Sequence, residues 1–304
     1  MDLAADPSAR HRAASFAGPD HFLIYRRHAR RLPGAPFCGL LRPRPRFDVM
    51  PEFELTPLVL VVVLIAGFTA GFIDSIAGGG GLISIPTLLA FDVPPHLAFG
   101  TNKLQSALGT TVAAANYARR GLVTRDGLVT GMGCTGIAAF AGAWCVTRVS
   151  ATLLVHLIPW LLGAVFLYVL VSPKLGDTRR AERINHAAFH VLFGLGLGFY
   201  DGFFGPGTGS FWTLGYVVLL GYTLPHATGH TKAMNVTSNY ASLAWFAWHG
   251  DVHWWLGLGM GAANIAGAFT GSSLAIRRGA GFIRGIFLAV VGALIVRLLW
   301  QAWR

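Results

Sequence analysis

Charged residues are scarce in this chain of 304 residues. Asp, Glu, Lys and Arg together make up 12% of the sequence, whereas hydrophobic residues make up 54%. Soluble domains contain about 25% charged residues, roughly twice the share found here. The scarcity of charge excludes an ordinary soluble protein, and it predicts a membrane protein whose outer surface faces lipid.

Lysine and cysteine are rarer still. The three lysines are Lys103, Lys174 and Lys232. The three cysteines are Cys38, Cys134 and Cys145. An odd number of cysteines without a Cys-x-x-Cys spacing predicts neither a zinc site nor a disulfide framework. No histidine lies at a metal-binding spacing from acidic residues, so we expect no metal and no cofactor.

Much of the positive charge lies at the N-terminal end. The formal net charge is +11, but residues 1–49 hold nine of the 24 basic and four of the 13 acidic residues. The remaining 15 basic and 9 acidic residues give a net charge of +6, which lies mostly in short loops. Such charge orients membrane spans, so we expect no nucleic-acid partner. We interpret residues 1–49, rich in Arg, Pro and Ala, as a mis-assigned start or a disordered extension, with a targeting segment as the alternative.

Two stretches of the chain resemble each other at a spacing of 127 to 129 residues. The first contains Asp74, four consecutive glycines and Lys103, and the second contains Asp201, a Gly-Pro-Gly sequence and Lys232. Asp74 thus matches Asp201, and Lys103 matches Lys232. A duplicated membrane unit whose matching helices are interrupted by glycine is typical of secondary transporters, in which the binding site lies at the repeat interface.

Ten apolar segments follow Met50, five in each copy. They lie at 57–76, 82–92, 98–118, 127–147 and 151–171, and again at 188–204, 207–221, 226–248, 253–275 and 282–303. The second segment of each copy is shorter than the roughly 20 residues of a full span and directly follows a glycine cluster. We predict a half-helix or a thin span at both places. Pro86 and Pro206 favour this interpretation, because proline interrupts a helix.

The predicted fold is an all-α polytopic membrane protein with two repeats, 50–173 and 187–304, joined by a cytoplasmic linker at 174–186. Arginines are concentrated after the third segment of the first copy and after the fourth segment of the second copy. These are Arg119, Arg120 and Arg125, and Arg277, Arg278 and Arg284. Because arginine marks cytoplasmic loops, the shift favours two inverted copies with five crossings each. Parallel copies of four crossings, with the short segments re-entrant, stay open as the alternative.

Three motifs mark the two copies: FIDSIAGGGG at 72–81, TNKLQ at 101–105 and FYDGFFGP at 199–206. They resemble the TauE/SafE sulfite exporter family, most closely its YfcA-like branch, and the resemblance covers about residues 55–303. It implies a multi-pass carrier of the inner membrane, and not an enzyme, for anions of sulfur metabolism such as sulfite or an organosulfonate. The expected partners are a small anionic substrate and the lipid bilayer, and a homodimer is one oligomeric state left open.

The residues of the two copies also suit an anion by their chemistry. A broken helix presents unpaired N–H groups and the positive end of its dipole, and lysine adds a full positive charge. The residues expected to bind the substrate are Gly79, Gly80, Thr101, Asn102, Lys103, Gly207, Thr208, Thr231, Lys232 and Asn235. Asp74 and Asp201 are expected to carry a proton during transport, since carboxylates inside membranes commonly serve in proton relays. No residue is expected to be catalytic.

Each of these residues also has a structural interpretation. The aspartates could form ion pairs or cap half-helices, the lysines could extend to the membrane interface, and the glycines could serve close helix packing. For the protein as a whole, an anion channel and a structural membrane protein are alternative functions. An intramembrane aspartyl protease, in which two carboxylates share a proton, is a third. Against the protease, each copy carries a lysine that would keep its carboxylate ionised.

Overall fold

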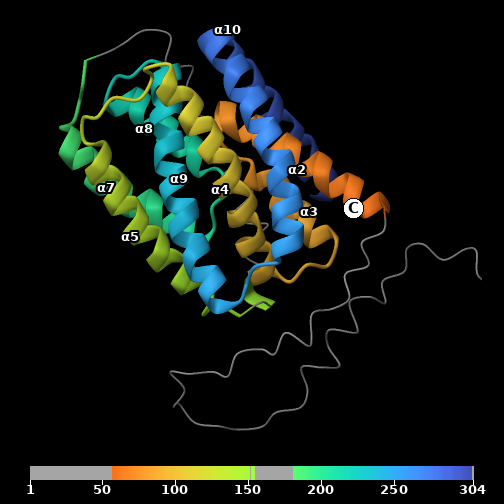
Figure 1. Cartoon of the computed structure of the whole chain (residues 1–304). Coiled ribbons are helices and arrows are strands. Elements are labelled where there is room, and N and C mark those ends of the chain that lie inside the picture. The colour runs from red at the N-terminus through yellow and green to blue at the C-terminus, as the bar shows by residue number, and fades with distance from the viewer. Residues whose placement is uncertain (1–56, 151, 155–180, 303–304) are drawn as a thin grey trace, which may run out of the picture. The chain divides into compact units, whose positions relative to one another are not determined.

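The computed structural model describes residues 57–150, 152–154 and 181–302, all within one compact unit, Pro45–Arg304. The described residues form helices and no strands (Figure 1). The helices are α2 (Pro57–Ala77), α3 (Gly81–Ala90), α4 (Pro95–Arg119), α5 (Leu128–Val146), α7 (His186–Phe203), α8 (Thr208–Leu219), α9 (Leu224–His249) and α10 (Trp254–Ala302). The predicted all-α fold is confirmed for the described residues, and it is consistent with a membrane protein.

The observed helices follow the predicted apolar segments to within a few residues. Helix α10 covers the last two predicted segments. Within it, Gly279 has φ 69° and ψ −160°, which are not helical values, and this residue separates a helix at 254–278 from one at 280–302. Most of the predicted segment 151–171, most of the linker 174–186 and the whole extension 1–49 lie outside the described residues. Their assignments stay predictions.

Glycines create the two breaks that the sequence predicts. Gly78 and Gly79 have φ values of 77° and 104°, and Gly205 and Gly207 have values of 92° and 82°. Side chains are strongly disfavoured at such positive φ, so these positions require glycine. The helices that follow, α3 with 10 residues and α8 with 12, are too short to cross a hydrocarbon core of about 30 Å.

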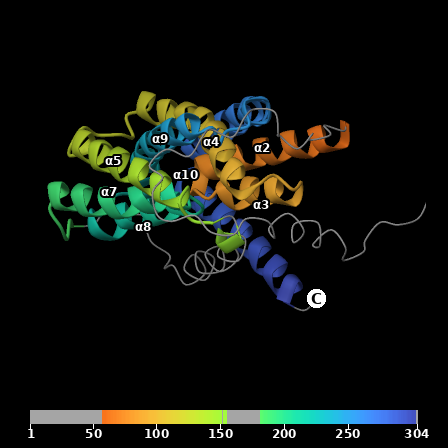
Figure 2. The same ribbon diagram turned by 90° about the horizontal axis from the view of Figure 1, so that it is seen from below.

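Helices from the two halves of the chain pack against each other throughout. Figures 1 and 2 show α4 and α9 in the middle, with α2, α3 and α10 on one side and α5, α7 and α8 on the other. The most extensive helix contacts are α2 with α10 and α5 with α7, followed by α4 with α10 and with α9. Each outer pair therefore combines a helix of the first copy with a helix of the second.

The outer pairs are parallel. Along α2 and α10, Gly67 lies against Met260 and Gly71 lies against Asn264, so the two helices run in the same direction. Along α5 and α7, contacts advance together in the same way, from Gly131 with His190 to Gly142 with Phe203 and Phe199. These close approaches have no space for a side chain at the glycine, since an added Cβ would lie within 2.7 Å of neighbouring atoms.

The central helices reverse this direction. Helices α4 and α9 are antiparallel, because Gly100 contacts Phe246 and Gly229 contacts Tyr117. Helix α4 is parallel to the first part of α10, because Leu104 contacts Gly257 and Leu108 contacts Gly261. Helix α9 is parallel to α5. Met234 contacts Gly131, Thr237 contacts Gly136, and Ser242 contacts Ala139. Consequently α2, α4 and the first part of α10 run one way, and α5, α7 and α9 run the other way.

The outer surface is apolar. Among the described helices, α2 and α5 are long and apolar enough to cross a membrane, with mean hydropathies of 2.3 and 1.4. Their exposed residues include Leu58, Ile65, Val129 and Ile137. Trp248 and Trp255 are 85% and 82% exposed near the turn between α9 and α10, where an interfacial aromatic residue is favourable. Exposed apolar faces combined with a polar interior are the arrangement expected in lipid.

Candidate functional site

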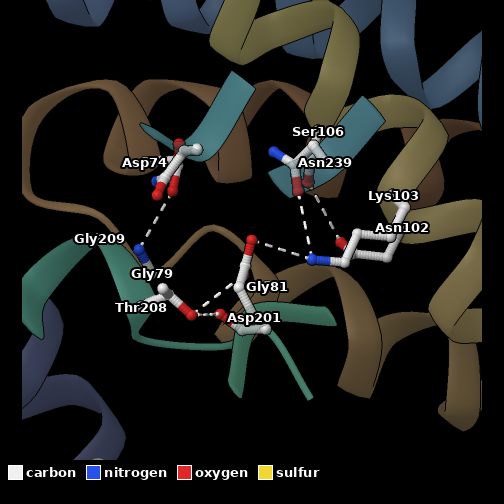
Figure 3. A pocket seen from close by; sticks show the side chains of 12 residues that line it. Asp74, Gly79, Gly81, Asn102, Lys103, Ser106, Asp201, Thr208, Gly209 and Asn239 are labelled. Carbon is white, nitrogen blue, oxygen red and sulfur yellow. Dashed lines mark hydrogen bonds and ion pairs between the residues drawn. The ribbon is translucent and has the colours of Figure 1, made fainter. Parts of the chain in front are cut away.

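A small cavity of about 30 Å³ lies where the two glycine breaks meet the middle of α4 and α9 (Figure 3). Both copies contribute to its wall. The lining residues are Asp74, Gly79, Gly81, Asn102, Lys103, Ser106, Asp201, Gly205, Thr208, Gly209, Asn235 and Asn239. The volume accommodates on the order of two water molecules.

The two breaks touch each other beside this cavity. A Cβ at Gly78 would lie 2.7 Å from the Cα of Gly209, and Gly81 packs on Pro206. The hydroxyl of Ser210 donates to the carbonyl of Ala77 at 3.1 Å, which links the end of α2 to the start of α8. The glycines thus serve two purposes, the backbone turn and the close contact between copies.

Lys103 on α4 reaches across to the second copy. Its Nζ lies 3.2 Å from Oδ2 of Asp201 and donates to Oδ1 of Asn239 at 3.3 Å. Figure 3 shows the ammonium group between these two oxygens at the cavity. An ammonium group has three donors, and the third has no partner among the described residues. Lys103 therefore presents both charge and an unused donor to the cavity.

Lys232 on α9, the matching residue, is held differently. Its Nζ lies 3.1 Å from Oδ2 of Asp74 and donates a short hydrogen bond to the Asp74 carbonyl. The Lys232 side chain has 0% exposure, and it does not line the cavity. A cation at the C-terminal end of a helix is favourable, so Lys232 stabilises the broken end of α2.

The two carboxylates also differ in their hydrogen bonds. Asp201 accepts from the hydroxyls of Thr208 at 3.0 Å and of Ser238. Asp74 accepts from the backbone N–H groups of Gly79 and Gly80, at 3.2 and 3.3 Å. The carboxylate of Asp74 thus caps the start of α3 and takes up N–H groups that the sequence analysis assigned to an anion.

The structure brings seven of the twelve predicted site residues to the cavity wall. These are Asp74, Gly79, Asn102, Lys103, Asp201, Thr208 and Asn235. The other five, Gly80, Thr101, Gly207, Thr231 and Lys232, do not line it. The hydroxyl of Thr101 accepts from the N–H of His253, and that of Thr231 lies 3.1 Å from the Thr213 hydroxyl, so both have structural partners.

Sequence reasoning missed five lining residues, Gly81, Ser106, Gly205, Gly209 and Asn239, and a partner of Asp201, Ser238. The spacing of polar residues along the predicted helices could have identified two of them, Ser106 and Asn239. Ser106 lies three residues after Lys103, and Asn239 lies seven after Lys232, so each shares a helix face with its lysine. Ser106 also matches Asn235 in the other copy. Polar residues at these spacings within apolar helices indicate a buried polar stripe.

The chemistry of the wall favours a small anion with hydrogen-bond acceptors. Lys103 supplies charge, and Thr208 and Asn102 supply polar groups from the two copies. Asn235 is 6% exposed, and its Oδ1 atom is buried without a hydrogen-bond partner within the part of the chain that the structure describes. An amide oxygen is an acceptor, so this unpaired atom indicates a place for a hydrogen-bond donor at the cavity wall, such as a water molecule or a protonated group of a ligand. No group of three or more metal-ligating side chains occurs among the described residues.

Known proteins resemble the chain over nearly all of its membrane region. A family model described as "Sulfite exporter TauE/SafE" matches residues 63–298. A probable membrane transporter protein of Haemophilus influenzae is 39% identical over 246 residues, which cover 81% of this chain and 96% of that protein. The probable membrane transporter protein YfcA of Escherichia coli K12 is 39% identical over 250 residues, or 82% of this chain and 93% of that one.

A third relative, the probable membrane transporter protein ORF9 of a Sinorhizobium species, is 42% identical over 241 residues, which cover 79% of this chain and 92% of that protein. No solved structure matches the chain. The matched regions contain both glycine breaks and both Asp–Lys pairs.

Proposed function

Because the chain belongs to the sulfite exporter TauE/SafE family, whose members are membrane transporters, we propose that it is a secondary-active exporter of a small oxyanion. Sulfite and organosulfonates are the substrates that we favour. The location that we propose is the inner membrane, with multiple crossings. The observation that carries the proposal is the position of Lys103, whose ammonium group lies at a small cavity between two broken helices.

Binding of an anion at this cavity requires the Lys103–Asp201 pair to loosen. The cavity of about 30 Å³ is too small for an oxyanion of four or five heavy atoms while that ion pair is closed. An anion that takes the ammonium group leaves Asp201 buried without a counter-charge, which costs several kcal/mol. Uptake of a proton by Asp201 removes that charge. We propose that this exchange couples the anion to a proton.

The coupling predicts the behaviour of Asp201→Asn. The parent protein in vesicles should transport sulfite at a rate that changes with pH, because each transported anion is proposed to move together with a proton on Asp201. The Asn variant should keep sulfite binding, because Lys103 remains, and should lose the pH response. The measurement is radiolabelled sulfite flux at each pH, with binding followed by the melting temperature.

The matched control is Asp74→Asn, which removes the carboxylate that pairs with the fully buried Lys232. This variant should lower the amount of folded protein while the surviving protein keeps the pH response. A full pH response in Asp201→Asn would contradict proton coupling through Asp201. Absence of sulfite flux in the parent would contradict sulfite as the substrate. Accumulation of sulfite against its gradient would distinguish a carrier from a channel.

We also infer that the two copies are inverted repeats. The directions of the helices support this, since α2, α4 and the first part of α10 each run opposite to the matching helices α7, α9 and α5. The crossed ion pairs support it as well, because Lys103 pairs with the aspartate of the second copy and Lys232 with that of the first. Inverted repeats around a central site are the arrangement that alternating access uses.

The inverted arrangement predicts opposite labelling of two matching loops. Single cysteines at Arg120 and His249, both exposed at the ends of α4 and α9, should react with a membrane-impermeant maleimide from opposite faces. The arginines near Arg120 predict that its face is cytoplasmic. The native cysteines would first be replaced by alanine. Labelling of both sites from one face would contradict the inverted model and restore parallel repeats.

A further inference from the structure

The side-chain oxygen of Asn102, at the wall of the cavity, accepts hydrogen bonds from within the protein. Its Oδ1 atom accepts from the hydroxyl of Ser84 at 2.5 Å and from Nε2 of Gln105 at 2.9 Å. An amide oxygen has two lone pairs, and both are engaged. The Nδ2 group has no hydrogen-bond partner within residues 57–150, 152–154 and 181–302, and Asn102 lines the cavity. In this orientation Asn102 offers the cavity a donor.

A second amide fixes the orientation of the first. Gln105 gives its NH2 group to Asn102, and its Oε1 atom accepts from Nδ2 of Asn264 on α10 at 2.5 Å. Both Gln105 and Asn264 are buried, with 0% and 3% exposure. If Gln105 turned around, it would present an oxygen to Asn102, and Asn102 would have to present its own oxygen to the cavity. The direction of this chain of hydrogen bonds therefore decides whether Asn102 presents a donor or an acceptor to the substrate.

Two glycines, Gly71 and Gly109, determine the direction of the hydrogen-bond chain at its Asn264 end. A Cβ at Gly109 would lie 1.6 Å from Oδ1 of Asn264, and one at Gly71 would lie 2.7 Å from the same atom. The Cα–H bonds of both glycines on that side therefore point at this atom. Cα–H groups make favourable contacts with oxygen and unfavourable ones with the hydrogens of an NH2 group. The glycines thus keep the oxygen of Asn264 on their side and its NH2 group toward Gln105.

The matching interface between the copies has the same packing without any amide chain. At positions 129 residues later, or 129 residues earlier for Asn264, the chain has Thr213, Thr231, Met234 and Thr135 in place of Ser84, Asn102, Gln105 and Asn264. The Thr213 and Thr231 hydroxyls lie 3.1 Å apart, and the Thr135 hydroxyl donates to Sδ of Met234 at 3.6 Å. A threonine and a methionine are therefore sufficient to pack this position. The amide chain at the first interface, from Asn102 and Gln105 to Asn264, exceeds what packing requires.

We propose that Gln105 and Asn264 are positioning residues that hold Asn102 as a hydrogen-bond donor to the transported oxyanion. The inference depends on the proposed function, since it assigns a role to the same cavity. It adds a cause of selectivity. An oxyanion accepts from both Lys103 and Asn102, whereas a ligand that presents donors of its own to Asn102 finds no acceptor there.

The test replaces residues of the amide chain with those of the matching interface. Gln105→Met alone leaves the amide of Asn264 without its acceptor, so the melting temperature should fall. Adding Asn264→Thr should restore the melting temperature toward that of the parent, because the pair then matches Met234 and Thr135. Sulfite affinity should stay about tenfold weaker in the double variant, corresponding to about 1.4 kcal/mol. A merely structural role predicts that affinity returns together with stability.

Affinity is measured by isothermal titration of sulfite, with sulfate and thiosulfate as further probes, and Met234→Leu is the matched control with parent-like affinity. A parent-like Kd in the double variant would overturn the inference and leave the proposed function intact. Absence of binding of all three anions to the parent would overturn both. If the double variant does not fold, Asn264→Thr alone is measured, and a parent-like Kd there overturns the inference.

Discussion

Replacing Lys103 with alanine in an Asp201→Asn background is expected to weaken sulfite binding about ten- to a hundredfold, because a charge-assisted hydrogen bond contributes about 1.5–3 kcal/mol. Lys103 is the lysine whose ammonium group borders the cavity, with one donor unused. The Asn background matters, since Lys103→Ala alone would leave the Asp201 carboxylate buried without its partner. The measurement is the sulfite Kd of the double variant by isothermal titration.

Asp201→Asn by itself is the control for that experiment. It removes the carboxylate that competes for Lys103, so its affinity for sulfite should equal or exceed that of the parent. The melting temperature of each variant shows that the protein is folded. An unchanged Kd in the double variant would remove Lys103 from the binding site and would leave the cavity without its principal charge.

Lys232→Ala should act on stability, and it should do so strongly. The residue has 0% exposure and holds both the carboxylate and the carbonyl of Asp74. Removing one partner of a buried ion pair costs about 3–5 kcal/mol, which is a large part of a total stability of about 5–15 kcal/mol. We expect little folded protein and a markedly lower melting temperature.

The companion variant separates charge from packing. Adding Asp74→Asn to Lys232→Ala removes the uncompensated carboxylate, so part of the lost stability should return, and the coupling energy of the double-mutant cycle should differ clearly from zero. A melting temperature of Lys232→Ala within error of the parent would contradict the anchoring role. A selective loss of sulfite affinity in a stable Lys232→Ala protein would assign both lysines to binding.

Helix positions were predictable because each depends on local properties of the sequence. Apolar segments separated by Gly, Pro and charged residues gave helix bounds close to those observed, and the glycine clusters marked both breaks. The short length of α3 and α8 followed from the same signals. The parallel packing of α2 with α10 and of α5 with α7 was not predictable from these signals, because it joins segments far apart in the chain.

A position at the cavity wall was predictable where the repeat gave two independent signals, as for Asp74, Asp201 and Lys103. The exclusion of Thr101 and Thr231 was not predictable, because their partners become neighbours only after the helices pack. The difference between Lys103 and Lys232 was hidden for a related reason. Repetition in the sequence indicates equal roles, while the local environment, set by unlike neighbours such as Asn239 and the Asp74 carbonyl, makes the roles unequal.

The crossed packing also bears on how such a chain could arise. The first helix of each copy is covered along its length by a helix of the other copy that runs parallel to it, α2 by α10 and α7 by α5. Under the proposed inversion, a gene that encoded one copy would have needed a product able to insert in both orientations, so that two oppositely oriented molecules could pair. Fusion of two such genes fixes one orientation for each half. After fusion, Gln105 and Met234 could diverge, so an amide chain from Asn102 and Gln105 to Asn264 could form at one of the two matching interfaces, whereas a symmetric dimer would have had to carry it at both.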